Sequence, residues 1–456
     1  MASTVSSRPR PPPPPGPPPH SKARPSPPSR PPPPRAPRPP PPPPPPARLV
    51  GTKRPAAAPL VPAPPAQKPR KDPTKIFLVP KTLRDVNAFA KQKQVGQGTY
   101  GSVFSGKDKQ TKDIVALKRI NTEQEANGFP ITAIREVKIL KALHHANIVQ
   151  LKELVTSKEQ GGEIPKNVFM VFEYLEYDLT GVLDSPEIRF TQDHVKSWSQ
   201  QLLSGVHYMH TNKVIHRDLK ASNLLINRKG ELKIADWGLA RSWNAEMKRL
   251  TNRVITLWYR PPELLLGYVD YTPKIDMWST GCIIAEMFRR KALFQEHEEP
   301  RMLDLIFRTC GTPTAENWPD LPKRSSNWKN VEPAHSYPRR IRETLKANLP
   351  NPKWMTDNAV DIIDKLLILD PEKRWSAEQA LYAEYFFENP IVKPADELPM
   401  NFSVTSKHEW DCKKKYEQMQ ARKRQAQASN GGTLRPPPPP KTTSSVAKPP
   451  PPPPRK

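Results

Sequence analysis

The sequence predicts an α+β chain with two lobes between two proline-rich tails. Of its 62 prolines, 31 lie within residues 1–71 and 11 within residues 404–456, so the middle of the chain carries an ordinary share. In that middle part, short apolar–polar alternation gives way near residue 177 to long stretches in which apolar residues recur at helical spacing. A small sheet followed by a larger helical part is typical of an α+β fold.

The tails are predicted to be disordered. In residues 1–84, proline runs such as Pro39–Pro46 fix φ and remove backbone donors, which favours an extended polyproline II rod. Residues 429–456 repeat this composition. Composition leaves two interpretations open, a solvated spacer or a ligand for SH3 or WW domains.

Most of the net charge of +27 belongs to the tails. Residues 72–403 hold 47 Lys or Arg and 42 Asp or Glu, so the folded part is not a basic nucleic-acid-binding domain. The pair Lys53-Arg54 and the cluster Lys68–Lys71 resemble a bipartite nuclear import signal. The alternative is a basic patch that only keeps the tail soluble.

The three cysteines, Cys282, Cys310 and Cys412, match no metal-binding spacing and indicate a reducing compartment. No stretch approaches the ~18 apolar residues that a membrane helix needs. The segment Met1–Pro15 has no apolar core of a secretion signal. We therefore expect an intracellular chain with no membrane segment.

The folded part is predicted to begin near Asp85 with a small sheet. Three antiparallel strands are expected around residues 94–95, 102–104 and 114–118, and two more around Ile148–Val155 and Val168–Glu173. Between them, Pro130 predicts a helix that starts at that residue. Its apolar residues follow helical spacing: Ile131, Ile134, Val137, Leu140 and Leu143. Later helices are expected over Val195–His210 and Lys274–Phe288.

A glycine-rich segment, Gly96–Val103, joins the first two strands. Its glycines Gly96, Gly98 and Gly101 allow backbone N–H groups to approach phosphate closely. Because a strand and not a helix follows, the segment favours a hairpin over phosphates and disfavours a dinucleotide-binding turn. Taken alone, it also fits a purely structural hairpin.

Two charged residues follow this segment. Lys118 closes an apolar strand and can neutralise nucleotide phosphates, while Glu136, on the predicted helix, can orient the Lys118 ammonium group. Each residue alone also fits a solvated surface position.

The most specific segment is 216–223, His-Arg-Asp-Leu-Lys-Ala-Ser-Asn, followed by Asp236-Trp237-Gly238. Asn223 and Asp236 supply the oxygen ligands that magnesium prefers beside phosphates. Asp218 can accept a hydroxyl proton, and Lys220 can stabilise a transferred phosphoryl group. Capping residues in a loop are the alternative, but this set rarely arises in this order by chance.

Together these motifs resemble a eukaryotic protein kinase over about residues 85–387. The matching segments are Gly96–Val103, Val115–Lys118, Glu136, His216–Asn223, Asp236–Gly238 and Pro261–Glu263. The resemblance implies a bilobal fold, with a β-rich N-lobe containing one regulatory helix (85–175), a helical C-lobe (176–387) and a basic extension (388–428). Trp237 and Pro261 replace the usual Phe and Ala, but no catalytic group is missing.

The resemblance also implies the site residues and the cofactors ATP and Mg²⁺. The catalytic residues would be Lys118, Glu136, Asp218 and Lys220, and the metal ligands Asn223 and Asp236. ATP would be bound by Val95, Gly96, Gly98, Gly101, Val103, Ala116, Lys118, Glu173, Leu175 and Leu225, behind the gatekeeper Phe172. Activating phosphorylation would occur on Thr251, with Arg135, Arg217 and Arg241 as a phosphate clamp, and inhibitory phosphorylation on Thr99 and Tyr100.

Residues 130–136, Pro-Ile-Thr-Ala-Ile-Arg-Glu, and the segment 251–263 resemble cyclin-dependent kinases of the transcription-elongation branch, including plant C-type kinases. This implies a cyclin docked at Phe129–Arg135, substrates with Ser/Thr-Pro sites whose proline contacts Val254 and Ile255, and the RNA polymerase II tail as substrate in the nucleus. In that branch His408-Glu409 would fold back toward the nucleotide cleft, whereas a solvated helix is the alternative. A cell-cycle or splicing kinase, and an adaptor with a scaffolding kinase domain, also stay open.

Overall fold

The computed structural model describes residues 83–98, 101–120, 130–157, 167–244, 246, 250–325, 327–333, 335–402, 406–410, 414 and 419–420. All of them belong to one compact unit, residues 78–456. Both proline-rich tails with their basic clusters, together with Thr99, Tyr100, Phe129 and Cys412, lie outside the described residues.

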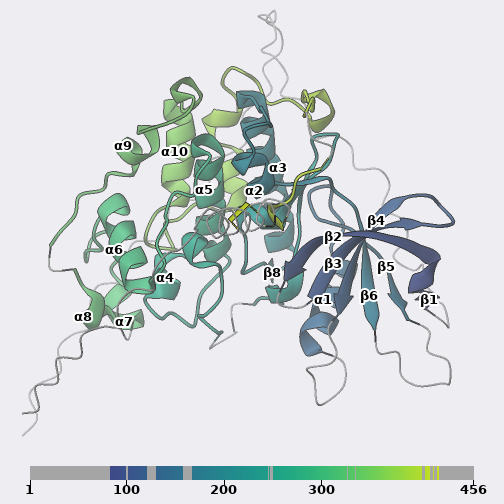
Figure 1. Cartoon of the computed structure of the whole chain (residues 1–456). Coiled ribbons are helices and arrows are strands. Elements are labelled where there is room, and N and C mark those ends of the chain that lie inside the picture. The colour runs from purple at the N-terminus through teal and green to yellow at the C-terminus, as the bar shows by residue number, and fades with distance from the viewer. Residues whose placement is uncertain are drawn as a thin grey trace, which may run out of the picture. The chain divides into compact units, whose positions relative to one another are not determined.

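A six-stranded sheet with the order β1-β5-β6-β4-β3-β2 forms the smaller lobe (Figure 1). Its strands are β1 Arg84–Asp85, β2 Phe89–Gly98, β3 Gly101–Asp108, β4 Ile114–Ile120, β5 Leu151–Thr156 and β6 Val168–Glu173. All neighbours pair antiparallel except β1 with β5. One face of this sheet has its own small apolar core of Phe89, Val115, Leu117, Val155 and Val171.

Helix α1, Ile131–Ala142, confirms the predicted helix of this lobe. Pro130 occupies the N-cap position and not the first helical position, because its ψ of 123° is not helical. The buried stripe consists of α1 residues such as Ile139 and Leu140, whereas Ile131 and Ile134 are 68% and 44% exposed. The predicted strand start at Ile148 was wrong, because Ile148 instead forms an isolated parallel bridge with Ile234.

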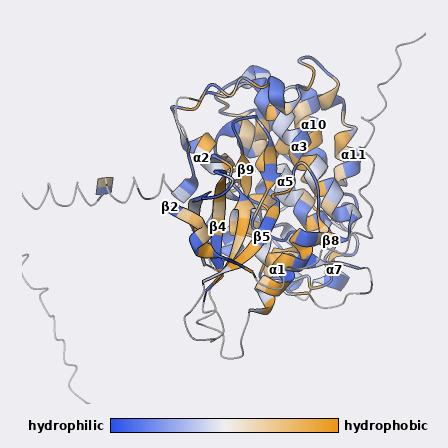
Figure 2. Cartoon of the chain, turned by 90° about the vertical axis from the view of Figure 1, so that its right-hand side faces the viewer, coloured by the Kyte–Doolittle hydropathy of each residue, from blue (hydrophilic) through white to orange (hydrophobic). Residues whose placement is uncertain are grey.

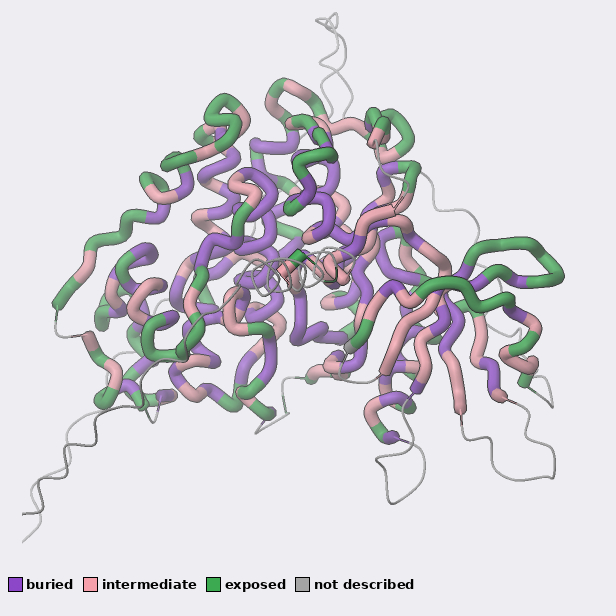
Figure 3. Tube along the Cα trace, viewed as in Figure 1, coloured by how far each residue is buried: buried purple, intermediate pink, exposed green. Residues whose placement is uncertain are grey.

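The larger lobe is mainly helical, as predicted. Its helices are α2 Leu179–Asp184, α3 Gln192–Thr211, α4 Pro262–Leu265, α5 Lys274–Arg289, α6 Glu299–Cys310, α7 Leu321–Arg324, α8 Trp328–Val331, α9 Ile341–Lys346, α10 Asp357–Leu366 and α11 Ala377–Leu381. In α5 every residue from Ile275 to Phe288 is buried, so this helix forms the centre of the lobe (Figure 3). Cys282, within this helix, and Cys310, the last residue of α6, are buried free thiols.

Short strand pairs connect the helices near the junction of the lobes. Strands β7 Tyr177–Asp178, β9 Leu224–Ile226 and β10 Leu232–Ile234 form one small sheet, and β8 Val214–Ile215 pairs with β11 Arg241–Ser242. Hydrophobic residues are frequent in strands such as β4 and β5, whereas the helices carry both hydrophobic and hydrophilic residues (Figure 2). Among the described residues, no helix combines the length and apolarity needed to cross a membrane.

Candidate active site

A cluster of one ammonium group and two carboxylates, one of which (Asp236) is 42% exposed, joins the two lobes. Lys118 Nζ, from the middle of β4, lies 2.8 Å from Glu136 Oε1 on α1 and 3.0 Å from Asp236 Oδ1. The side chains of Lys118 and Glu136 are 12% and 3% exposed. The structure therefore brings together three predicted residues that are widely separated in the sequence.

The charges of this cluster support one another. Burial alone would lower the pKa of Lys118, but the two carboxylates outweigh it and raise the pKa above its ordinary value. The Lys118 ammonium in turn lowers the pKa of Asp236. Burial raises the pKa of Glu136, while Lys118 opposes that rise. Asp236 is thus a carboxylate at neutral pH, and Lys118 is a permanent cation.

The backbone at Asp236 is in the left-handed region, with φ of 59°. The next residue, Trp237, is 1% exposed, and its indole N–H donates to the Ile234 carbonyl at 3.2 Å. Its ring also packs edge-on against His216, with ring centroids 4.9 Å apart. The departure from the usual Phe therefore adds a hydrogen bond that a Phe could not make and that holds this turn in place.

The predicted catalytic loop places its polar groups around Asp218. Lys220 Nζ donates to Asp218 Oδ2 at 2.9 Å, and the side-chain amide of Asn223 donates to the Asp218 carbonyl at 2.8 Å. Thr256 Oγ1 donates to Asp218 Oδ1 at 3.0 Å. Thr256 lies in the segment 251–263 that resembles the family, but it was not predicted as a site residue because it is 38 positions away from Asp218.

A further residue missed by the sequence analysis holds this loop. Asp276, fully buried near the start of α5, accepts hydrogen bonds from the backbone N–H groups of His216 (2.9 Å) and Arg217 (3.0 Å). His210 Nε2 lies 2.9 Å from the same carboxyl group. Burial would raise the pKa of Asp276, but these donors outweigh it and lower the pKa. The available signal was an acidic residue near the start of the predicted helix Lys274–Phe288.

The donor set fits a hard divalent cation. Asn223 and Asp236 offer one amide oxygen and one carboxylate, and hard cations such as Mg²⁺ prefer oxygen ligands. Within the described part of the chain, no group of three or more His, Cys, Asp or Glu could hold a metal ion alone. A cation between Asn223 and Asp236 therefore needs further oxygen ligands, which phosphates supply.

The predicted adenine-binding residues lie on paired strands and at the lobe junction. Val95 is buried on β2, and Val103 on β3 pairs with Lys118 in register. Ala116 on β4 and Leu225 on β9 are partly buried against the large core. Gly96 pairs with Val103 and Gly98 with Gly101, and the φ of 144° at Gly101 favours glycine.

The segment between the lobes begins at the end of β6. Phe172, the predicted gatekeeper, is 8% exposed and pairs in register with Ala116. The side chain of Glu173 accepts a hydrogen bond from the Gln150 N–H at 2.8 Å, which fixes the end of the strand. Leu175, two residues on, is buried.

The activation segment lies against the catalytic loop. Thr251 is exposed, and its carbonyl accepts a hydrogen bond from Tyr271 at 2.8 Å. The Tyr271 hydroxyl, which donates that bond, itself accepts a hydrogen bond from Arg217 Nη1 at 3.0 Å. Helix α1, which carries Arg135, contacts strand β11, which begins with Arg241. The structure thus gathers the elements that carry the three predicted clamp residues.

A C-terminal segment, Ser406–Trp410, lies along the junction of the lobes. Lys407 N–H donates to the Glu176 carbonyl at 3.0 Å, and the Lys407 carbonyl accepts from the Asp178 N–H at 3.2 Å. The Glu409 N–H donates to Asp178 Oδ2 at 2.7 Å. His408 is buried 6.2 Å from the ring of Tyr174, measured between ring centroids.

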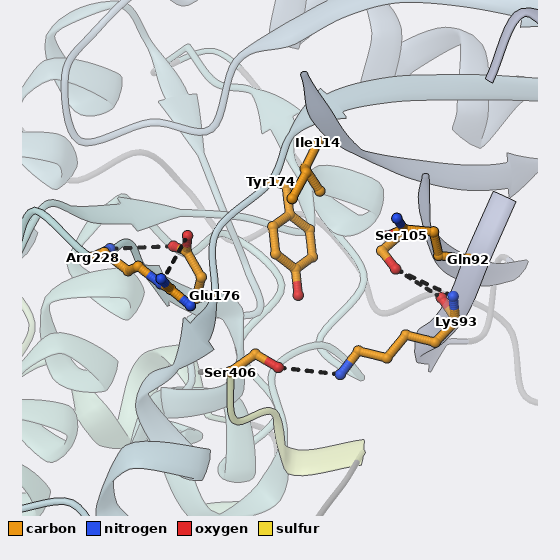
Figure 4. Close-up of a pocket in the computed structure, with 8 residues that line it drawn as sticks. All are labelled: Gln92, Lys93, Ser105, Ile114, Tyr174, Glu176, Arg228 and Ser406. Carbon is orange, nitrogen blue, oxygen red and sulfur yellow. Dashed lines mark hydrogen bonds and ion pairs between the residues drawn. The ribbon is translucent and has the colours of Figure 1, made fainter. Parts of the chain in front are cut away.

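Ser406 of this segment also lines a pocket of about 570 Å³ (Figure 4). Lys93 Nζ on β2 donates to Ser406 Oγ at 3.2 Å, so the segment contacts both lobes. The lining residues are Gln92, Lys93, Ser105, Ile114, Tyr174, Glu176, Arg228 and Ser406.

Comparisons with known proteins agree with this geometry. Residues 89–386 match the family model of the protein kinase domain. The chain is 48% identical to cyclin-dependent kinase C-1 of rice over 74% of this chain and 65% of that protein. It is 43% identical to cyclin-dependent kinase 9 of zebrafish over 68% of this chain and 83% of that protein.

A solved structure described as the yeast RNA Pol II CTD kinase CTDK-1 complex contains a similar chain. The TM-score is 0.61 at 39% identity, and the match covers 68% of this chain and 97% of that chain. The match spans about 65% of the length of the rice and Arabidopsis C-type relatives.

Proposed function

The chain belongs to the protein kinase family and, within it, to the cyclin-dependent kinases, and on this premise we propose that it transfers the γ-phosphoryl group of ATP to serine or threonine hydroxyls. The observation that carries this proposal is the contact of Lys118 with both Glu136 and Asp236. This arrangement aligns a cation for phosphates with a carboxylate for a metal ion. Phosphoryl transfer depends mainly on such positioning and charge neutralisation.

In the proposed mechanism Asp218 accepts the proton of the substrate hydroxyl. Its Oδ1 is oriented by Thr256, and its Oδ2 by Lys220. Lys220 then stabilises the transferred group, and Lys118 neutralises the remaining phosphates. Asn223 and Asp236 would hold Mg²⁺, which supplies further charge neutralisation when bound.

The backbone at Ile255 supports a preference for proline after the phosphorylated residue. Its φ of 67° turns the carbonyl toward Arg260, whose Nε and Nη2 donate to it at 3.1 and 3.0 Å. This carbonyl is therefore used within the protein and is not offered to an incoming peptide N–H. Proline has no N–H and loses nothing there, whereas other residues would leave a donor unpaired.

The exposed apolar residues of α1 support a cyclin as partner. Ile131 and Ile134 are 68% and 44% exposed on the helix that also carries Glu136. A partner that covers these side chains would bury apolar area and fix the distance from Glu136 to Lys118. The proposed docking region is Phe129–Arg135.

We further propose the RNA polymerase II tail as substrate, transcription elongation as process and the nucleus as location. The similarity to the zebrafish cyclin-dependent kinase 9 and to the yeast CTD kinase chain supports the substrate. The basic clusters 53–54 and 68–71 support nuclear import. The proline-rich tails would recruit SH3 or WW domains.

The proposal is tested by isolating the full chain with its cyclin from cells and assaying phosphate transfer to Ser-Pro heptad peptides. Peptides with Ala in place of Pro are the specificity control, and Asp218→Asn is the catalytic control. We expect transfer to the Ser-Pro peptide that Asp218→Asn abolishes. No transfer to any hydroxyl by the partner-loaded chain would contradict the proposal.

A further inference from the structure

Tyr271 connects the catalytic loop with the activation segment. It lies in the loop before α5 and is 3% exposed. Its hydroxyl accepts a hydrogen bond from Arg217 Nη1 at 3.0 Å and donates one to the Thr251 carbonyl at 2.8 Å. A single phenol therefore joins the residue beside the proton acceptor to the residue that is the proposed phosphorylation site.

A second contact supports the same connection. The Leu250 N–H donates to the Val269 carbonyl at 2.6 Å. Two successive residues of the activation segment, Leu250 and Thr251, are thus held by the loop 269–271. Both contacts reach the backbone of the segment and leave the side chain of Thr251 exposed.

Arg217 extends the connection to the rest of the site. Its Nε donates to the Leu239 carbonyl at 2.8 Å, just after the Asp236–Gly238 turn. Its own carbonyl accepts from the Ile255 N–H at 3.0 Å, at the proposed proline pocket. Arg217 therefore connects the residue after the metal-binding turn, the proline pocket and, through Tyr271, the Thr251 segment. These hydrogen bonds are all within the protein and need no phosphate on Thr251.

We propose that Tyr271 is a positioning residue that holds the Thr251 segment in its working place before Thr251 is phosphorylated. The inference rests on the proposed kinase function and adds a regulatory consequence. The cyclin-bound kinase has a basal activity that depends on Tyr271, and a phosphate on Thr251 replaces this contact through Arg135, Arg217 and Arg241. Tyr271 matters in the dephosphorylated enzyme and becomes dispensable in the phosphorylated enzyme.

The matched variants are Tyr271→Phe and Tyr268→Phe. Each removes one buried hydroxyl from the same loop, but among the described residues the Tyr268 hydroxyl has no hydrogen-bond partner. The full chain with its cyclin is assayed before and after phosphatase treatment, with the state of Thr251 checked by mass spectrometry. We expect Tyr271→Phe to lower kcat about tenfold in the dephosphorylated form, as loss of a bond to a charged donor would do, and less than about twofold in the phosphorylated form. Tyr268→Phe should change neither.

A second measurement does not depend on activity. Arg253 is exposed two residues after Thr251, so tryptic cleavage there reports how firmly the segment is held. Tyr271→Phe should accelerate cleavage only in the dephosphorylated form. Equal effects on both forms, or no effect on either, would overturn the inference. If the wild type transfers no phosphate but Tyr271→Phe still accelerates cleavage only in the dephosphorylated form, the kinase function is contradicted and the role of Tyr271 is supported.

Discussion

The attachment of the C-terminal segment can be tested by one methyl group on Gly181. A Cβ there would lie 2.7 Å from the Lys407 oxygen and 3.0 Å from its carbonyl carbon. Both are backbone atoms, so the clash is relieved only if the segment moves. We therefore expect Gly181→Ala to detach residues 406–410 from the lobe junction without unfolding the lobes.

The size of the effect follows from the contacts that are lost. The two backbone hydrogen bonds of Lys407 contribute about 0.5–1.5 kcal/mol each, and the bond from Glu409 N–H to the Asp178 carboxylate about 1.5–3 kcal/mol. The smallest loss, about 2.5 kcal/mol, increases opening of the segment about seventyfold.

Amide hydrogen exchange of residues 406–409, measured by mass spectrometry, is the assay. Thr180→Ala, at the neighbouring position of α2, is the matched control. Unchanged exchange in a folded Gly181→Ala protein would refute the reasoning. The same variant tests the proposed role of His408-Glu409 near the nucleotide, which predicts a higher KM for ATP, whereas an equal KM contradicts it.

Four further predictions concern single side chains. Trp237→Phe removes the indole hydrogen bond that holds the metal-binding turn in place. Inhibitors that bind only when this turn is displaced should therefore bind the variant about tenfold more tightly, and equal affinity contradicts the role of this bond. Ile131→Asp should prevent retention of the cyclin on an affinity resin without changing the Tm, and normal retention argues against docking on α1. Arg374→Met leaves Glu263 buried and unpaired and should lower the free energy of unfolding by about 3–5 kcal/mol; a loss below about 1 kcal/mol contradicts this. Burial raises the pKa of Glu286 to about 7, so the folded state binds more protons than the unfolded state, and the free energy of unfolding should fall as pH rises from about 5 to 7. Glu286→Gln should remove that fall. If the pH dependence of the free energy of unfolding is unchanged in this variant, Glu286 is not its source.

Local motifs made the chemistry of the site predictable. Lys118, Asp218 and Asp236 were identified because each sits in a short pattern whose residue types have a chemical reason. The structure pairs Lys118 with Asp236 and surrounds Asp218 with Lys220 and Thr256, while the catalytic roles of these residues stay predictions. The strands and helices with strong periodicity, such as α5, were also predicted within a few residues.

The supporting residues could not be predicted in this way. Asp276 and Tyr271 act on backbone groups or on residues more than 50 positions away, so no local spacing marks them. Arg374 pairs with Glu263 at a separation of 111 positions. Strand β5 begins later than predicted because the apolar residue Ile148 packs at the lobe junction instead of in the sheet.

The anchoring of the catalytic loop by Asp276 divides the machinery into a fixed and a movable half. The backbone of His216 and Arg217, directly before Asp218, is tied to the most deeply buried helix of the large lobe, whereas Lys118 and Glu136 belong to the small lobe. A protein that binds α1 can therefore shift one half while the other keeps its shape. Such an enzyme is controlled by movement of the small-lobe residues relative to a catalytic loop that stays fixed. We therefore expect that no binding partner can restore the activity of variants in which the Asp276 anchor is loosened.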